Sequence, residues 1–366
     1  MTKLHRTTIS RRRFLTLGGA AVAGAGLVSC SRPATDSPTA VAPTVTPVEP
    51  PRIVRRRRLG RTGFEVSDIS SGAAGNDANV FRYAYDLGVN YFDSAETYGN
   101  GEAERKLGEA LQHMDRGKVF VTTKLVIEPE DTEATLLDRF GGCQERLRTE
   151  YVDALFQHSV QDVDLLGNEP FHAVVRRLKA DGRLRFAGVS CHGAEDEDDD
   201  SMEQVLVAAA EDGRFDLMLI AYNFLKAEQG ERVLAACAAH DVGTTGMKSA
   251  PASLDIEPYD PDNPTEEYAD YIARAAERGT SREEAEERIR SWIEEQEETL
   301  VQAGPFIEQR GLTTDDELRI ASIRWVLANP DMHTVCIGFR DFDEVERAVR
   351  LSGTPAEQTA RSGGAA

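Results

Sequence analysis

Four ionisable residues interrupt apolar stretches of the sequence at positions that could bring them to one site. Asp93 ends the run NYFD, and Tyr98 follows it after five residues. Lys124 and His158 lie near the ends of two further runs, FVTTKL and LFQHS. Taken singly, Asp93 could cap a turn, Lys124 could extend its ammonium group to solvent and His158 could be a structural residue. Because the four follow three successive apolar runs, we interpret them as a functional site.

A phenol beside an ammonium group suits proton transfer. Free tyrosine has a pKa of about 10 and is a slow acid at neutral pH. The Lys124 ammonium would favour the phenolate and make Tyr98 a better proton donor, and Asp93 would pair with Lys124 so that the cation is not buried alone. Tyr98 could then protonate a carbonyl oxygen as the carbon accepts a hydride from nicotinamide, while His158 orients that oxygen.

The chain that must position these residues alternates short apolar runs with helical stretches from residue 59 onward. The expected strands are 68–74, 90–95, 118–125, 152–159, 185–192, 216–223, 242–248 and 334–339. Expected helices include 79–88, 103–114, 169–182, 202–212, 231–241 and 317–330. Eight strand-plus-helix units predict an α/β fold, a (β/α)8 TIM barrel, in which functional groups lie where strands end and loops begin. An open doubly wound sheet is the alternative, but no GxGxxG follows the first strand.

The connection between the seventh and eighth strands is unusually long. Its excess, about 250–312, begins with a turn-rich segment and continues into a charged helix around 281–303 with Trp292, Ile293 and Leu300 as a thin apolar stripe. In a barrel this insert would emerge at the carboxyl end of the seventh strand. We interpret it as a lid over the site or as an element that interacts with a partner. The alternative is a peripheral insertion without a function of its own.

Several motifs together resemble the aldo-keto reductase family. RRLGRTGFEVS (57–67), NYFDSAETYG (90–99), YVDALFQHS (151–159) and FAGVS (186–190) are similar to family signatures, and 324–348 resembles the cofactor-binding C-terminal segment. The resemblance covers about 57–250 and 313–350. It implies that Asp93, Tyr98, Lys124 and His158 form a catalytic tetrad, and it implies no metal.

The resemblance also implies positions that hold the cofactor. The expected cofactor-binding residues are Ser190, Cys191, Met247, Lys248, Gly338, Phe339, Arg340 and Glu344. Three depart from the family pattern: Cys191 stands where Asn is usual, Met247 where an aromatic often stacks, and Glu344 where NADP-specific members usually place Arg. Leu219 also replaces a usual Gln. A carboxylate at Glu344 would repel a 2′-phosphate and could bind a ribose hydroxyl instead, which favours NAD. Arg340 could compensate for that carboxylate, so NADP is kept as the family default and NAD stays possible.

The implied function is an NAD(P)-dependent oxidoreductase. It would reduce an aldehyde, ketone or sugar carbonyl, or oxidise the alcohol, with Tyr98 as general acid/base and a small-molecule carbonyl as partner. The alternative is a nucleotide-binding, redox-sensing or interaction module with little turnover, which the altered residues Cys191, Leu219 and Glu344 favour. Tyr98→Phe distinguishes the two functions. An enzyme should lose most of its catalytic rate while it still binds nucleotide, whereas the signal from a sensing module should not change.

The first fifty-two residues read as targeting sequence. SRRRFLT (10–16) precedes the apolar run 17–28 and the sequence LVSC ending at Cys30, which resembles a twin-arginine signal followed by a lipobox. We therefore expect a signal over 1–30, a Pro/Thr/Ala-rich tether over 31–52, the barrel domain over 53–353 and a disordered tail over 354–366. The protein would be exported and contact a membrane only through a lipid on Cys30. An uncleaved signal anchor and cleavage elsewhere are the alternatives.

The net charge and the cysteine positions bear on two further questions, which are nucleic-acid binding and disulfide formation. The formal net charge of −21 argues against a nucleic-acid partner and indicates an acidic, solvated surface. Cys143, Cys191, Cys237 and Cys336 show neither CxxC nor metal-ligand spacing. They are expected as buried thiols rather than disulfides.

Overall fold

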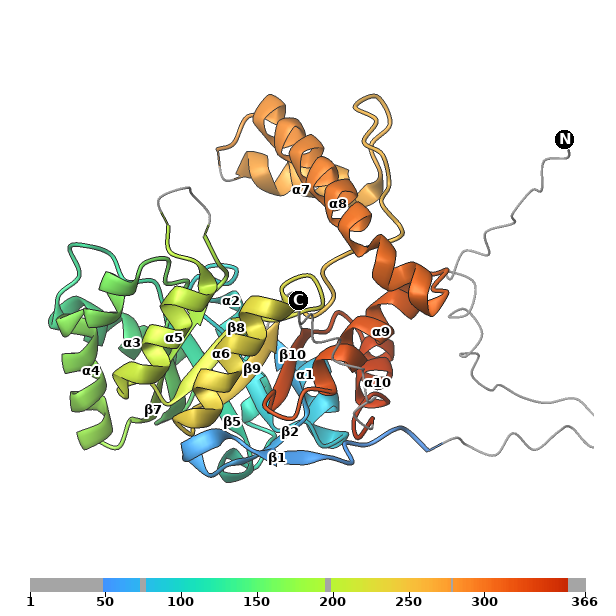
Figure 1. Ribbon diagram of the computed structural model, residues 1–366. Coiled ribbons are helices and arrows are strands. Elements are labelled where there is room, and N and C mark those ends of the chain that lie inside the picture. Colours follow the sequence, from blue (N-terminus) through green and yellow to red (C-terminus); the bar gives the residue numbers. More distant parts are fainter. Residues whose placement is uncertain (1–48, 73–76, 195–198, 278, 355–366) are drawn as a thin grey trace, which may run out of the picture. The chain divides into compact units, whose positions relative to one another are not determined.

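The computed structural model describes residues 49–354 except 73–76, 195–198 and 278, and the predicted signal, most of the tether and residues 355–366 lie outside this part of the chain. Its centre is a closed barrel of eight parallel strands in the order β10-β3-β4-β5-β6-β7-β8-β9 (Figure 1). The predicted (β/α)8 fold is confirmed. The barrel strands are β3 (Ile69–Gly72), β4 (Tyr91–Asp93), β5 (Phe120–Leu125), β6 (Val152–Gln157), β7 (Leu184–Cys191), β8 (Leu217–Ala221), β9 (Gly243–Met247) and β10 (Thr334–Gly338).

The helices pack around the barrel. Six of them lie close to their predicted ranges, and two, over 133–147 and 342–349, had no predicted range. They are α1 (Ala78–Asp86), α2 (Glu102–Leu111), α3 (Glu133–Leu147), α4 (Glu169–Ala180), α5 (Met202–Asp212), α6 (Ala227–Ala239), α9 (Asp315–Leu327) and α10 (Phe342–Val349). Their starts follow capping rules. The Ser201 hydroxyl, for example, accepts a hydrogen bond from the Gln204 backbone N–H, and the Gln204 side-chain oxygen accepts one from the Ser201 backbone N–H, a capping box that begins α5.

A hairpin closes the amino-terminal end of the barrel. Strands β1 (Arg56–Arg58) and β2 (Glu65–Ser67) pair antiparallel, and Leu59 between them is fully buried in the barrel interior with Phe120 and Leu217. The turn at Gly60 has a φ of +47°, and an added Cβ would lie 2.3 Å from the backbone nitrogen of Gly243, so a side chain would not fit there. The opposite, carboxyl end is left for the functional groups.

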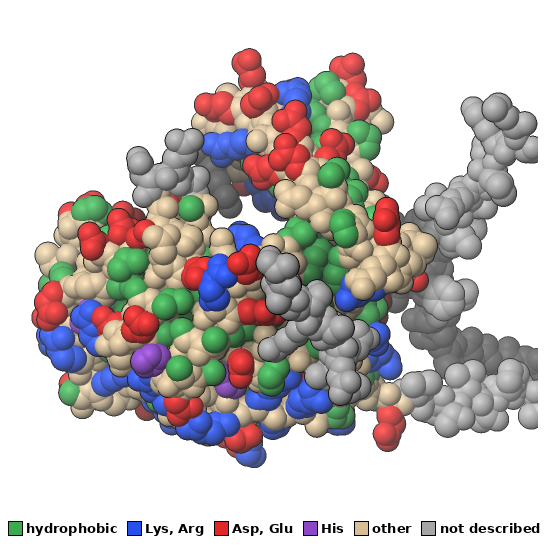
Figure 2. Space-filling view, in the orientation of Figure 1, with side chains coloured by type: hydrophobic (Ala, Val, Ile, Leu, Met, Phe, Trp, Pro, Cys, Tyr) green, Lys and Arg blue, Asp and Glu red, His purple; other side chains and the backbone are tan. Residues whose placement is uncertain are grey.

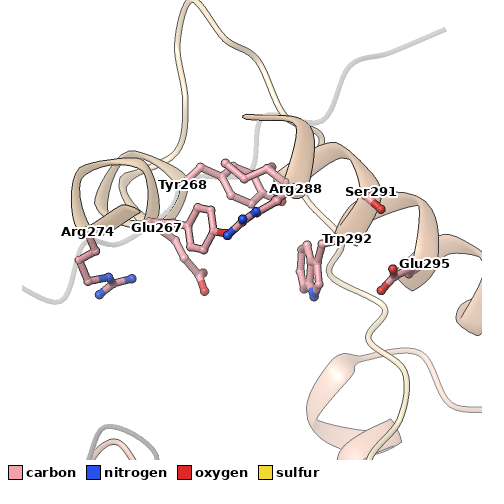
Figure 3. A pocket seen from close by; sticks show the side chains of 9 residues that line it. Glu267, Tyr268, Arg274, Arg288, Ser291, Trp292 and Glu295 are labelled. Carbon is pink, nitrogen blue, oxygen red and sulfur yellow. The ribbon is translucent and has the colours of Figure 1, made fainter. Parts of the chain in front are cut away.

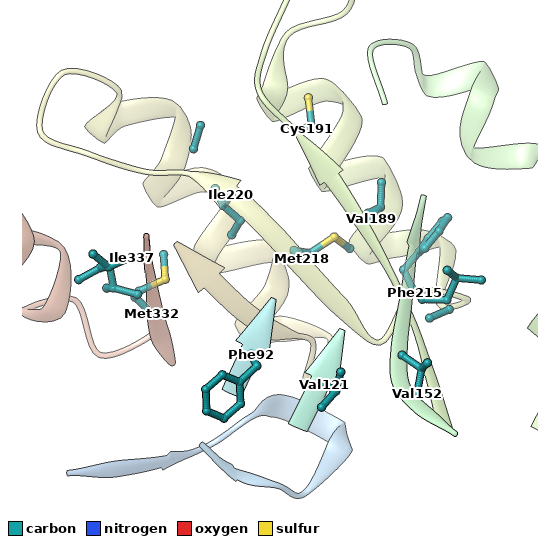
Figure 4. Packing of buried hydrophobic residues seen from close by; sticks show 14 of the residues in the cluster. Phe92, Val121, Val152, Val189, Cys191, Phe215, Met218, Ile220, Met332 and Ile337 are labelled. Atoms are coloured by element: carbon teal, nitrogen blue, oxygen red, sulfur yellow. The ribbon is translucent and has the colours of Figure 1, made fainter. Parts of the chain in front are cut away.

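The larger core lies between the strands and the surrounding helices (Figure 4). Phe92, Val121, Val189 and Ile220 turn outward from four strands into this layer and are buried. Each strand is covered on both faces, which is why the sequence shows continuous apolar runs instead of alternation. None of the cysteines within the described residues forms a disulfide. Cys143, Cys191 and Cys237 are buried, as predicted, whereas Cys336 is only partly buried because it lines the cleft beside β10.

The insert between β9 and β10 contains two helices, α7 (Glu266–Glu277) and α8 (Arg282–Arg310). Residues 250–312 carry 17 acidic and 6 basic side chains, and acidic side chains crowd the insert's surface in Figure 2. The C-terminal part of α8 is anchored, because the Phe306 ring stacks on Phe224 at 3.9 Å and Ala303 is fully buried.

The apolar stripe of α8 differs from the one expected. Trp292 is 48% exposed, and Ile293 and Leu300 are only partly buried. The buried positions are Ala285, Ile289, Ala303 and Phe306. Two alanines, an isoleucine and a phenylalanine therefore provide the close packing, and Trp292 is left at the surface of the helix pair (Figure 3). Among the described residues, none of the helices has the length and apolarity needed to cross a membrane.

A partly buried histidine just before β10 makes the stability of the fold depend on pH. His333 Nδ1 accepts a hydrogen bond from the backbone N–H of Thr244 at 3.0 Å, and burial, aided by Arg57, lowers the pKa of His333 to about 4. The unfolded chain therefore takes up this proton at a higher pH than the folded protein. The contribution of neutral His333 to the free energy of unfolding is therefore complete above about pH 6.5 and is lost as the pH falls toward 4.

His333→Asn is expected to weaken this acid sensitivity, since the Asn carbonyl oxygen can accept the same bond without titrating. Between pH 7 and about 4.5 the variant should lose about 2 kcal/mol less free energy of unfolding than the wild type. Urea denaturation at the two pH values measures this. The exposed His113 replaced by Asn is the control, and equal losses in both variants would contradict the assignment.

Candidate active site

A buried ion pair forms the base of the site at the carboxyl ends of β4 and β5. Lys124 Nζ lies 2.5 Å from Asp93 Oδ2 and donates to the Ser94 carbonyl at 2.7 Å. Thr122 donates to the other Asp93 oxygen at 2.7 Å. Lys124 is fully buried and Asp93 is 4% exposed. Although burial lowers the pKa of Lys124, the Asp93 carboxylate outweighs it and raises that pKa above the usual value, so the lysine is an ammonium ion.

Tyr98 reaches the same point from the loop after β4. A turn closed by the Tyr98 N–H and the Ala95 carbonyl brings the phenol back over the strand ends. Its hydroxyl oxygen lies 3.4 Å from Lys124 Nζ, and the ammonium lies 4.7 Å from the ring centroid. The five-residue spacing thus lets one residue brace the lysine while the other faces the mouth.

The protonation of Tyr98 differs in one respect from the expectation. Burial raises the pKa of Tyr98 above 10, and the Lys124 ammonium lowers that pKa by a smaller amount. The phenol is consequently protonated at neutral pH. Lys124 offsets a desolvation penalty instead of producing a phenolate, and Tyr98 retains a proton to give.

His158 completes the group from the end of β6. Its ring lies edge-on to Tyr98 with centroids 5.6 Å apart, and its backbone N–H donates to the Leu125 carbonyl at 2.9 Å. Burial, with Lys124 and His192 nearby, lowers the pKa of His158 to about 3. The ring is neutral, and its buried Nδ1 has no hydrogen-bond partner among the described residues. A neutral imidazole beside the phenol can orient a substrate oxygen.

The next two predicted positions lie at the end of β7. Ser190 is fully buried, and its hydroxyl oxygen accepts the Ser159 N–H at 2.9 Å, which leaves the hydroxyl proton free to be donated. Cys191 is also fully buried. Leu219 on β8 packs in the barrel interior beneath the site. Ser190 is thus placed to bind a ligand group, whereas Leu219 contributes packing.

A cleft of about 330 Å³ opens beside β9 and β10. It is lined by the chain after β9, including Ser249, by Gly338 at the end of β10, by Arg319 of α9 and by Gln296 of α8. Met247 is partly buried at the end of β9 and Lys248 is exposed. Loops after the last two strands form phosphate sites in many such barrels. The buried Ser249 hydroxyl has no partner among the described residues, so the cleft suits a phosphate-bearing nucleotide.

The segment after β10 is arranged around one carboxylate. The Phe339 side chain is fully buried in the core, so only its backbone can reach a ligand. Arg340 donates to Glu344 through Nε at 2.9 Å and Nη2 at 2.7 Å. Burial opposes ionisation of Glu344, but these bonds hold its pKa below the usual value. Glu344 therefore neutralises Arg340 instead of presenting a free carboxylate.

Two basic residues at the mouth had no place in the sequence prediction. Lys226, at the start of α6, donates to the His192 carbonyl at 3.1 Å. Burial, with Lys248, Lys124 and Lys226 nearby, lowers the pKa of His192 to about 4. The Asn223 side-chain amide fixes this rim by donating to the Lys248 carbonyl at 2.9 Å. The one sequence signal for His192 is the dipeptide HG after FAGVSC. Because this dipeptide is ordinary in loops, the sequence did not identify His192 as a site residue.

With this geometry in place, comparison with known proteins identifies the family. The sequence model of the Aldo/keto reductase family matches residues 75–360. The chain belongs to the aldo/keto reductase family. No cluster of three or more potential metal ligands occurs in the described ranges.

Curated relatives of this aldo/keto reductase match over part of their length. A Schizosaccharomyces pombe protein named as a voltage-gated potassium channel subunit beta is 31% identical over 38% of this chain and 46% of its own. L-galactose dehydrogenase of Arabidopsis thaliana is 32% identical over 37% and 48%, respectively. D-threo-aldose 1-dehydrogenase of a Pseudomonas species is 26% identical over 50% and 65%. The chain spans about half the length of the curated relatives that it matches.

Solved aldo-keto reductases share the fold. The holo form of AKR11C1 from Bacillus halodurans superimposes with a TM-score of 0.57 at 19% identity, covering 82% of this chain and 92% of that one. An aldo-keto reductase from Klebsiella pneumoniae, solved in complex with NADPH, gives 0.56 at 18% identity over 83% and 91%. At these identities the likeness supports the barrel architecture alone.

Proposed function

We propose that this protein is an NAD(P)-dependent oxidoreductase that reduces an aldehyde, ketone or sugar carbonyl, or oxidises the corresponding alcohol. The observation that carries the proposal is the contact of Tyr98 with a buried Lys124–Asp93 pair next to a neutral His158. Relatives named as dehydrogenases of L-galactose and of D-threo-aldose support a sugar-like substrate. The reductase solved with NADPH supports NADP as cofactor, with NAD as the alternative.

The protein's side chains would carry out the proton transfer. A nicotinamide cofactor supplies or accepts the hydride. In reduction, Tyr98 donates its hydroxyl proton to the carbonyl oxygen as negative charge develops there, and the Lys124 ammonium stabilises the resulting phenolate. His158 holds the same oxygen through a ring N–H. In alcohol oxidation the proton moves to Tyr98 in the reverse direction.

The residues around the strand ends would hold the cofactor. Ser190 has a hydroxyl proton to donate to the nicotinamide amide, with Cys191 beside it, and the partly buried Met247 offers a flexible, polarisable thioether contact for the ring. Ser249 and Gly338 line the cleft where a pyrophosphate would fit, and the exposed Lys248 precedes Ser249 in the chain. Phe339, Arg340 and Glu344 would lie toward the adenine end.

Nucleotide binding is the first test of this function. Fluorescence titration with NADPH and NADH is expected to give saturable binding of at least one of them, followed by turnover of a member of an aldehyde and aldose panel. Binding without turnover of any carbonyl or alcohol would favour the sensing alternative, to which the relatives named as channel subunits also point. Binding of neither nucleotide would overturn both functions.

Export by the twin-arginine route, with a lipid on Cys30, is proposed from the sequence LGGAAVAGAGLVSC after Arg11 and Arg12. Because this route carries folded proteins, the enzyme would leave the cell with its cofactor already bound. Full-length protein purified from the membrane fraction should then release one equivalent of nucleotide on denaturation. Recovery of the protein in the cytosol, or free of nucleotide, would contradict this proposal.

A further inference from the structure

An ion-pair cluster centred on α3 lies beside the turn that carries Tyr98. The Arg139 guanidinium pairs through Nη1 with Asp131 at 2.6 Å and through Nε with Glu96 at 3.2 Å, and its Nη2 contacts the second Glu96 oxygen. Nη2 also donates to the Val126 carbonyl at 2.6 Å. One side chain therefore connects the segment after β4, where Glu96 lies, to the segment after β5, where Val126 and Asp131 lie.

This cluster is better shielded from solvent than an ordinary surface ion pair. The side chains of Asp131, Glu96 and Arg139 are 8%, 14% and 27% exposed. A bidentate guanidinium–carboxylate contact also fixes the relative orientation of its partners, which a single point charge does not. Arg146, another cation on α3, interacts with Glu96 electrostatically. Its Nε, however, is bonded to Glu104 at 2.6 Å. The orientation of the Glu96 carboxylate is therefore set by its bonds to Arg139.

The position of the Tyr98 phenol depends on the turn to which Glu96 belongs. The Tyr98 N–H closes this turn by donating to the Ala95 carbonyl at 3.2 Å, and the Glu96 N–H donates to the chain of β5 at the Lys124 carbonyl, 3.3 Å away. Among the described residues, the Tyr98 hydroxyl has one hydrogen bond, the 3.4 Å contact with Lys124. Because so long a bond orients the phenol weakly, the turn itself must hold the ring in place. Within the turn, the Glu96 side chain supplies the bonds to a neighbouring helix.

We propose that Arg139 is a positioning residue for the proton transfer, because it fixes the turn that carries Tyr98 against the segment that follows Lys124. This inference rests on the proposed function and refines it, since Arg139 would act through Tyr98 and not on the reacting atoms. A misplacement of about 1 Å at a reacting group can cost on the order of 10²-fold in rate. A purely structural ion pair would instead stabilise the fold and leave the rate of the folded enzyme unchanged.

The test compares Arg139→Met with Arg139→Lys in the full-length protein, on a substrate from the aldehyde and aldose panel. Arg139→Met removes every bond of the cluster, so kcat for carbonyl reduction is expected to fall about 10- to 100-fold while the Kd for NADPH stays within about threefold. An ammonium group at this position can still bridge the two carboxylates, so Arg139→Lys should recover kcat to within about fivefold of the wild type. Arg232→Met is the matched control and should leave kcat unchanged, because Arg232 also joins two carboxylates, Glu203 of α5 and Glu228 of α6.

The double variant Tyr98→Phe/Arg139→Met shows whether Arg139 acts through Tyr98. Once the proton donor is absent, its misplacement has no further cost, so Arg139→Met should change the residual rate of Tyr98→Phe by less than about threefold. Glu96→Ala breaks the same link from the other side and leaves Arg139 paired with Asp131. It should therefore lower kcat as Arg139→Met does, with a smaller loss of stability. Thermal melting verifies that each variant is folded at the assay temperature.

The possible results separate this inference from the proposed function. If the wild type reduces a carbonyl and folded Glu96→Ala and Arg139→Met keep its full kcat, the positioning role is refuted and the reductase function stands. If Arg139→Met lowers the rate by the same factor with and without the Tyr98 hydroxyl, Arg139 acts independently of Tyr98 and the inference is equally refuted. Wild-type protein that turns over no carbonyl or alcohol would refute the reductase function and this inference with it.

Discussion

Tyr98→Phe is expected to lower the rate of carbonyl reduction by about 10²- to 10⁴-fold, the range that a positioned general acid contributes. The phenyl ring can keep its edge-on contact with His158 and the contact with the Lys124 ammonium, so only the proton donor is lost. The Kd for the nucleotide should change by less than about threefold, since the phenol lies at the substrate side. Steady-state kinetics and nucleotide titration on the same preparation measure the two effects.

Tyr83→Phe is the matched control for this result. Tyr83 also donates its hydroxyl in a hydrogen bond, to Glu346 at 2.6 Å, but it joins α1 to α10 away from the tetrad. Its loss should leave the rate unchanged. If Tyr98→Phe retained more than about a tenth of the activity, Tyr98 would not be the proton donor, and the sensing alternative would gain support.

Lys124→Met is expected to destabilise the protein by about 3–5 kcal/mol, because it leaves the Asp93 carboxylate buried without its cation. Asp93 is 4% exposed, and among the described residues it would keep the Thr122 hydroxyl as its one side-chain hydrogen-bond partner. The wild-type pair contributes throughout the neutral range. The raised pKa of Lys124 means that this contribution is lost only as the pH rises above about 10.5. Chemical denaturation at pH 7 measures the loss.

The double variant Asp93→Asn/Lys124→Met separates charge burial from packing. With both charges removed, no isolated ion is left inside the barrel, so the double variant should be more stable than Lys124→Met alone. It should still lack reductase activity, since nothing then stabilises the Tyr98 phenolate. A double variant that is less stable than Lys124→Met would show that the pair stabilises the fold through hydrogen bonds and shape more than through charge compensation.

The sequence by itself determined the barrel and the identity of its reactive end. The strand containing Lys124 was predicted as 118–125 and occupies Phe120–Leu125, and the other seven agree as closely. Strands buried on both faces must be apolar, so a lysine or an aspartate within them is conspicuous, and parallel strands bring their ends to one rim. These two facts predict that Asp93, Lys124 and His158 lie at one rim, with Tyr98 in the loop just after Asp93. The resemblance to the family implied that the four form one tetrad, and the distances show that they lie together.

Only the tertiary structure decided how far the pKa of each titratable group is shifted and which side chains the insert leaves at its surface. The net pKa of Tyr98 is set by burial against Lys124, a balance that depends on how much protein covers the phenol. The neutralisation of Glu344 by Arg340 reversed the simple reading of that carboxylate. Trp292, Ile293 and Leu300 were expected to form the apolar stripe of α8. Its buried positions are instead Ala285, Ile289, Ala303 and Phe306, and Trp292 borders a pocket. Helical spacing identifies a face, but what covers that face is fixed by contacts between segments distant in sequence.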